Sequence, residues 1–334
     1  MCNLTLEMRL FNHLLCLYLS GIIYLFAQSR LLKKFIFIRK FDETMALYVY
    51  FADFLNCPAR DVDCLQKKSV DEIVDAQMKA EKAVSSLQLL EFFEPWVPWL
   101  DGKIIKGELL EIEKWIGNES FPLKPFILGT LTEECVNYIY AAWTKPVSTK
   151  EYIEVITGSL KEDAVKAFTK YAPEKNTTDQ RSLMSVFATR WVFSCSSRQF
   201  IDTYLTNSKS NENAYYMYVF DFPFDFGGWG NDTYCFGHVC HGGDMPYTFD
   251  IPDANFTTVG HNIAIQHIQY WSNFAKNQSP NSNETLSTDD NLLYWPRYEI
   301  INRTNLRFKA PMNIIETNYL DKECDFLDSI GYYH

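Results

Sequence analysis

The chain has 334 residues, of which 47% are hydrophobic and 16% aromatic, and its formal net charge is −11. This apolar content can fill the core of one large or two medium domains and excludes global disorder. The acidic balance excludes a typical nucleic-acid binder, because phosphate recognition requires clustered lysine and arginine.

The first 40 residues differ from the remainder. An apolar stretch runs from Leu10 to Ala27, and basic residues such as Arg30, Lys33 and Lys34 follow it. Its length lies between those of a signal-peptide core and a membrane span. We therefore expect residues 1–40 to be a signal-like segment, a membrane anchor or a stretch that is not the native start of the domain. A partial domain then occupies residues 41–334.

Hydrophobic spacing predicts the main elements of that domain in chain order. Apolar residues at helical intervals predict helices over 69–92, 148–171, 179–205, 255–276 and 320–330. Short runs rich in aromatic and β-branched residues predict strands over 124–130, 215–222 and 306–310. Strands that alternate with longer helices indicate an α/β fold with a mainly parallel sheet flanked by helices.

Two residues follow predicted strands in the order that a serine hydrolase uses. Glu134 comes after the first strand and His241 lies in the loop after the second. An α/β-hydrolase carries Ser, then Asp or Glu, then His, with the Ser in Gly-x-Ser-x-Gly. The 334 residues contain no Gly-x-Ser-x-Gly; the nearest resemblance, at 117–121, has no second Gly.

Each candidate has an alternative nearby. Glu133 is adjacent to Glu134, and His238 precedes His241 by three positions. Gly242 beside His241 permits close approach of a substrate, so we expect His238 to be structural. The spacing of Cys235, His238, Cys240 and His241 would also suit zinc. We expect a disulfide there instead, and therefore no metal and no cofactor.

Several ordered segments resemble the type-B carboxylesterase/cholinesterase family, with details that lean toward its crystal-protein-like branch. They lie at 57–65, 99–102, 125–130, 218–221, 241–244, 270–276, 280–281, 295–296 and 324–327. The resemblance implies the C-terminal part of an α/β-hydrolase fold, with the N-terminal strands of the sheet missing. It also implies that His241 is the general base and Glu134 the carboxylate that orients it, and it favours Glu134 over Glu133.

The nine cysteines and the glycosylation sequons indicate the cellular compartment in which the protein folds. The resemblance implies the disulfides Cys57–Cys64 and Cys195–Cys324, and we add Cys235–Cys240. Besides Asn3, Asn-x-Ser/Thr sequons begin at Asn118, Asn176, Asn231, Asn255, Asn277, Asn283 and Asn302. Disulfides and glycosylation together predict a secreted or cell-surface protein.

These features lead to a family assignment and to alternatives for activity. The family implies hydrolysis of a small carboxylic ester. Because the Ser and the oxyanion hole are absent from the 334 residues, we expect a truncated domain that is inactive alone. Two alternatives remain open: a non-catalytic binding or adhesion protein with a protein partner, and an active esterase formed with a separate N-terminal half. A membrane contact through Leu10 to Ala27 also stays open.

Overall fold

The computed structural model describes residues 41–83, 124–207, 214–251, 254–281 and 292–332, together with Trp96 and Lys103. The expectations for residues 1–40, for the end of the predicted helix at 84–92, for the segment 117–121 and for the sequons at Asn118 and Asn283 lie outside these residues. The chain divides into two compact units, whose described parts belong to 34–108 and 109–334. Within the described ranges, no helix combines the length and the apolar character needed to span a membrane.

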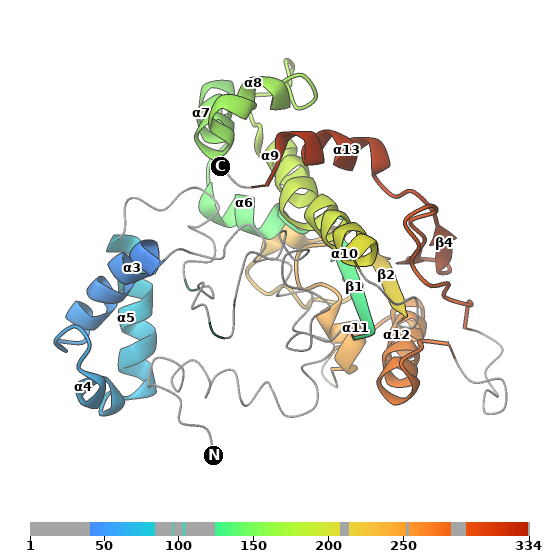
Figure 1. The fold of residues 1–334 in the computed structure, drawn as a ribbon, viewed down its shortest axis with the longest axis horizontal. Coiled ribbons are helices and arrows are strands. Elements are labelled where there is room, and N and C mark those ends of the chain that lie inside the picture. Colours follow the sequence, from blue (N-terminus) through green and yellow to red (C-terminus); the bar gives the residue numbers. More distant parts are fainter. Residues whose placement is uncertain are drawn as a thin grey trace. The chain divides into compact units, whose positions relative to one another are not determined.

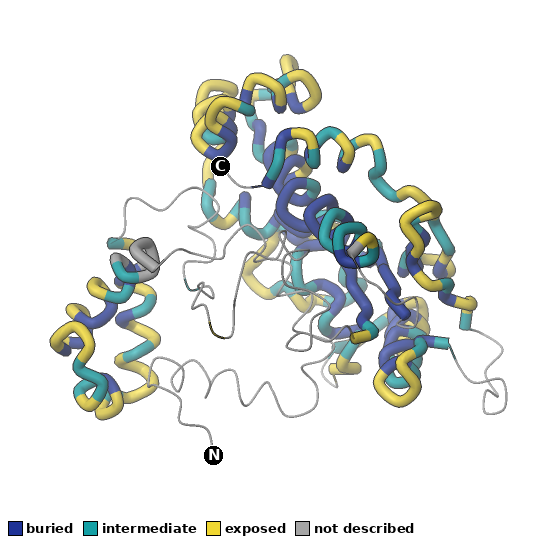
Figure 2. The backbone as a smooth tube through the Cα atoms, in the orientation of Figure 1, coloured by how far each residue is buried: buried dark blue, intermediate teal, exposed yellow. Residues whose placement is uncertain are grey.

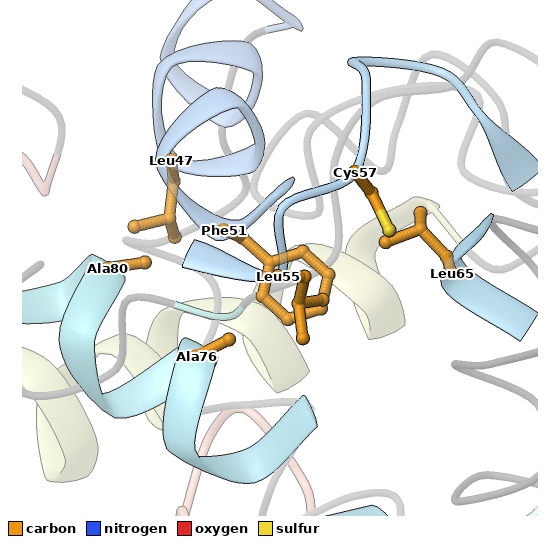
Figure 3. Packing of buried hydrophobic residues seen from close by; sticks show 7 residues of the cluster. All are labelled: Leu47, Phe51, Leu55, Cys57, Leu65, Ala76 and Ala80. Atoms are coloured by element: carbon orange, nitrogen blue, oxygen red, sulfur yellow. The ribbon is translucent and has the colours of Figure 1, made fainter. Parts of the chain in front are cut away.

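The first unit contains α3 (Phe41–Phe54), α4 (Val62–Gln66) and α5 (Val70–Ala83). Ser69 and Glu72 form a capping box at the start of α5, since each side chain bonds the backbone N–H of the other residue. The predicted helix thus begins where expected. The helix α3 was not predicted from the sequence. Its apolar side packs on the small residues of α5 in a cluster drawn in Figure 3: Leu47, Phe51, Leu55, Cys57, Leu65, Ala76 and Ala80.

The second unit is built on a four-stranded sheet in the order β1-β2-β3-β4. Figure 1 labels β1, β2 and β4 of this sheet. Its strands are β1 (Phe126–Leu131), β2 (Tyr215–Phe220), β3 (Asn305–Phe308) and β4 (Ile314–Glu316). The first three are parallel and β4 is antiparallel to β3. The mainly parallel sheet was therefore predicted correctly, and the short β4 was missed. Every residue of β1 and β2 is buried, as expected for parallel strands covered on both faces (Figure 2).

Helices cover both faces of this sheet. The helical elements are α6 (Val136–Ala142), α7 (Thr149–Leu160), η2 (Lys161–Asp163), α8 (Ala164–Ala167), α9 (Arg181–Ala188), η3 (Thr189–Ser194), α10 (Cys195–Asn207), η4 (Thr233–Cys235), α11 (Met245–Phe249), α12 (Thr258–Asn277) and α13 (Asp321–Ile330). On one face Tyr204 of α10 contacts Phe126, with ring centroids 5.1 Å apart. On the other, Trp271 of α12 contacts Tyr218, with centroids 5.2 Å apart. Successive side chains along each strand point to opposite faces of the sheet and so contact different helical layers.

Two helical predictions need correction. The helix expected over 148–171 is broken after α7, because Lys161 adopts a positive φ of 50° that no α-helix accommodates. The helical spacing of Ile265, Ile268 and Trp271 predicts an apolar face along α12, but Ile265 is 40% exposed. The buried face of α12 instead includes His267, whose ring packs against Phe308 of β3.

Candidate active site

The end of β1 presents Glu134 to the site. The strand ends at Leu131, and a tight turn leads into α6. Glu134 Oε1 accepts a hydrogen bond from the Leu131 N–H at 2.9 Å and one from the Thr130 hydroxyl at 3.4 Å. The carboxylate is therefore held by the strand that it follows, at the carboxyl end of a parallel sheet, where α/β folds place their sites.

The loop after β2 presents His241. A disulfide joins Cys235 to Cys240, directly before the histidine, and closes a loop of only five positions. Gly242 then adopts a φ of 83°, a conformation that favours glycine. The Gly243 N–H donates to the Cys240 carbonyl at 2.9 Å and completes the turn. His241 thus lies between the Cys235–Cys240 disulfide and the turn at Gly242.

Glu134 and His241 form a hydrogen-bonded pair. His241 Nδ1 contacts Glu134 Oε2. The Glu134 side chain is only 4% exposed, whereas that of His241 is 18% exposed. A neutral imidazole that donates from Nδ1 to a carboxylate has its lone pair on Nε2. The buried carboxylate therefore fixes a tautomer in which Nε2 can accept a proton.

Two aromatic rings flank the histidine. The centroids of Tyr138, on α6, and Phe193, on η3, each lie 5.4 Å from that of the His241 imidazole. Both rings thus restrict the orientation of the imidazole. Neither ring was identified from the sequence.

A second glutamate–histidine pair lies beside the first. Glu133 Oε1 is 2.8 Å from His238 Nδ1, and Glu133 Oε2 accepts the Val239 N–H at 2.8 Å. The structure therefore separates the two candidate glutamates, since Glu133 holds the start of the histidine loop and Glu134 contacts His241. His238 pairs with Glu133.

Below the histidine loop, Tyr218 of β2 is bound to Asp244. The Tyr218 hydroxyl donates to Asp244 Oδ2 at 2.9 Å. Burial raises the pKa of the Tyr218 phenol well above its ordinary value, and the negative charge of Asp244 raises it further. The phenol therefore stays protonated and acts as a fixed donor that anchors the start of α11 on the sheet.

Four aromatic residues precede the histidine loop in the sequence, namely Phe222, Phe224, Phe226 and Trp229. The ring of Phe224 stacks on both Phe226 and Trp229, with centroids 4.6 Å and 4.4 Å apart. Phe222 is buried against Tyr247. Phe224 therefore packs between two members of this group, whereas Phe222 packs on α11.

The cysteine pairing agrees with expectation. The disulfides Cys57–Cys64, Cys195–Cys324 and Cys235–Cys240 are all present. The last one also answers the zinc alternative, because both sulfurs are bonded to each other and are not thiolate ligands. Among the sequon asparagines that the structure describes, all are exposed: Asn176, Asn231, Asn255, Asn277 and Asn302.

The fold and this pair define the class of the protein. An acid after one parallel strand and a histidine after the next, between two layers of helices, are the second half of an α/β-hydrolase arrangement. Residues 36–327 match the Carboxylesterase family. The chain belongs to that family.

Comparisons with known proteins agree with this assignment. The crystal protein of Dictyostelium discoideum is 25% identical over 289 residues, which cover 84% of this chain and 50% of that protein. The cAMP-regulated D2 protein of the same organism is 26% identical over 288 residues, or 85% of this chain and 51% of that protein. The chain thus spans about half the length of these curated relatives.

Solved structures show the same fold. A Geobacillus stearothermophilus carboxylesterase superposes with a TM-score of 0.63 at 18% identity, covering 87% of this chain and 55% of its own. A PNB esterase superposes with a TM-score of 0.61 at 18% identity and the same coverage. The predicted fold class, the C-terminal part of an α/β-hydrolase, is therefore confirmed.

Proposed function

We propose that this chain supplies the acid and the base of a serine carboxylic-ester hydrolase. The observation that carries the proposal is the contact between the buried Glu134 carboxylate and Nδ1 of the more exposed His241. A serine hydroxyl is a weak nucleophile at neutral pH and requires such a base. The substrate class, a carboxylic ester, is the one that the family implies.

The chemistry of the two residues follows from their geometry. His241 Nε2 accepts the proton of a serine hydroxyl as that oxygen attacks the ester carbonyl, and it then returns the proton to the departing alcohol. Glu134 holds the tautomer and stabilises the imidazolium between these steps. The rings of Tyr138 and Phe193 restrict the orientation of the imidazole during these steps.

The nucleophile must come from outside these 334 residues, because they contain no Gly-x-Ser-x-Gly. We therefore propose that the chain alone does not hydrolyse esters. A segment that brings the Ser elbow and the oxyanion-hole N–H groups would complete the site. One oxyanion-hole donor can contribute about 3 kcal/mol to catalysis. Because these donors would also be missing, a water activated by His241 alone does not replace that segment.

Hydrolysis of a short-chain aryl ester tests this function. The purified chain should release no more phenol than its His241→Ala variant. Co-expression with a carboxylesterase-family segment that carries Gly-x-Ser-x-Gly should restore hydrolysis, and His241→Ala and Glu134→Ala should each remove it. Activity of the chain alone that depends on His241 would contradict the missing nucleophile. Failure of every complementing segment would favour the alternative of a binding protein.

We also propose that the protein passes through the secretory pathway. Support comes from the disulfides, which form in oxidising compartments, and from the exposure of the five described sequon asparagines. Expression in a eukaryotic secretory host should give a product whose mass falls on treatment with a peptide N-glycosidase. An unmodified product would argue against this location.

A further inference from the structure

The helical segment that contacts the Glu134–His241 pair contains an irregular turn. α9, η3 and α10 follow one another over 181–207, and at the end of η3 the Cys195 N–H donates to the Arg190 carbonyl, five positions earlier. This bond is the mark of a π-helix, which usually appears as a single wide turn within an α-helix and is frequent at functional sites. We infer that η3 positions the acid and base of the site through Thr189, Phe193 and Ser194.

Each of these three side chains contacts a different part of the pair's surroundings. Thr189 Oγ1 accepts the Cys135 N–H, directly after Glu134, at 3.0 Å. The Phe193 ring contacts the His241 ring, with centroids 5.4 Å apart. η3 therefore contacts both the segment that carries the carboxylate and the imidazole itself.

The third contact reaches the carboxylate through a hydroxyl chain. Ser194 Oγ lies 3.3 Å from Thr130 Oγ1, and that oxygen lies 3.4 Å from Glu134 Oε1. Thr189, Phe193 and Ser194 are only 3%, 6% and 3% exposed, so bulk water does not compete for these contacts. In a buried site such a chain of hydrogen bonds restricts every member, because an unpaired group there is costly.

The wide turn explains how one helix makes all three contacts. In an α-helix, about 100° per residue places positions five apart roughly 140° away from each other around the axis. In a π-turn, roughly 80° per residue reduces that separation to roughly 40°. Thr189, Phe193 and Ser194 consequently share one side of the helix. A regular α-helix over the same residues would turn Ser194 away from Thr189.

The same turn also provides a control residue. Trp191 is 3% exposed, as buried as the positioning residues, but its Nε1 donates to the Gly331 carbonyl at 2.9 Å. Its ring stacks on Phe187, with centroids 5.6 Å apart. Trp191 therefore joins the turn to the C-terminal segment, and Trp191→Phe tests how the turn responds to a loss of stability on that side.

The inference rests on the proposed function for its catalytic meaning, but its test needs no substrate. We would follow the His241 Nδ1–H resonance by NMR in the full-length chain, assigning it by its loss in His241→Gln. Thr189→Val, Phe193→Leu and Ser194→Ala should shift this resonance or remove it through faster exchange with water. Trp191→Phe should lower the melting temperature and leave the resonance in place. Thr189→Ser, which restores the acceptor oxygen, should recover it.

An unchanged resonance in the folded Thr189→Val, Phe193→Leu and Ser194→Ala variants would overturn the inference. If a larger replacement does not fold, Ser194→Ala decides alone, since it removes a single oxygen. Loss of the resonance in Trp191→Phe as well would also overturn it, because the effect would then be general destabilisation. Absence of ester hydrolysis in a complemented enzyme would count against the proposed function and not against this positioning role.

Discussion

Glu133 and Glu134 are adjacent in the chain, yet their carboxylates bind opposite ends of the same short loop. Glu133 holds His238 and the Val239 N–H, whereas Glu134 holds His241. Because both glutamates follow β1 directly, the parallel strand determines the position of the loop that carries the base. The two acids therefore have separate tasks, one in placing the loop and one in orienting the imidazole.

Replacing Glu133 should loosen this loop with little effect on overall stability. Glu133→Ala removes the acceptor of the Val239 N–H, so amide exchange at Val239 should accelerate about fivefold, the equivalent of one hydrogen bond. The global free energy of unfolding should fall by less than about 1 kcal/mol, since the pair with His238 is partly exposed. Hydrogen exchange and urea unfolding measure the two effects.

Glu133→Gln is the matched control for this change. Its amide oxygen can still accept the Val239 N–H, so Val239 should remain protected. A similar acceleration in Glu133→Gln and Glu133→Ala would show that the charge on Glu133, and not its hydrogen bond, holds the loop.

Replacing Glu134 should have a larger effect. Glu134→Ala leaves the buried Leu131 N–H and the His241 Nδ1–H without their acceptor, which should cost about 2–4 kcal/mol in urea unfolding. Glu134→Gln retains an acceptor oxygen for Leu131 and should cost less. Its amide group faces the imidazole, however, and should reverse the tautomer, which ¹⁵N NMR of His241 reports. Retention of the wild-type tautomer in Glu134→Gln would contradict this role.

Periodicity and resemblance were sufficient for the main elements and the central pair, but not for their supports. A run rich in aromatic and β-branched residues predicted β2, and the order of motifs pointed to Glu134 and His241. The π-turn leaves no trace in a hydrophobic pattern, because Thr189 and Phe193 also fit an ordinary buried helix face. Its geometry depends on tertiary contacts, which override local helical preference.

The break after α7 and the short strand β4 were missed for related reasons. The local sequence contains no residue that excludes a helix at Lys161. Its positive φ places it at the start of the turn that follows α7. β4 has three residues and pairs along one edge, where Arg307 of β3 binds both Asp221 and Glu316. The pairing of β4 thus depends on its register with β3 and on these ion pairs. A strand of three residues is also too short to show an alternation of apolar and polar residues.

The Cys195–Cys324 disulfide should contribute more to stability than Cys235–Cys240. The first closes 129 positions and the second five. On the loop-entropy account these correspond to about 5 and about 2 kcal/mol. Arg198 should keep α13 in place in Cys195→Ala/Cys324→Ala, because its guanidinium forms ion pairs with Asp321 and Asp325. Guanidinium unfolding of the two double variants gives the comparison; a greater loss from Cys235→Ala/Cys240→Ala would contradict the entropic explanation.

His267 should make the protein less stable as the pH falls. Its side chain is fully buried on α12, with its ring centroid 4.4 Å from that of Phe308, and burial lowers its pKa from 6.5 to about 3. Below pH 6.5 the unfolded chain takes up a proton at this residue, whereas the folded protein does so only near pH 3. The stability contributed by neutral His267 is therefore present above pH 6.5 and is lost progressively toward pH 3, by on the order of 1 kcal/mol per pH unit.

His267→Phe isolates this effect, because phenylalanine fills the aromatic environment and does not titrate. The variant loses the contact between His267 Nδ1 and the Thr248 hydroxyl, 3.3 Å apart, so it should be less stable at pH 7 by about 1 kcal/mol. Between pH 7 and pH 5, where most carboxylates stay ionised, its stability should fall less steeply than that of the wild type, by the uptake of one proton. Urea unfolding at several pH values measures the two slopes. Equal slopes would mean that His267 is protonated in the folded protein, in which case the aromatic residues around it would be stabilising an imidazolium.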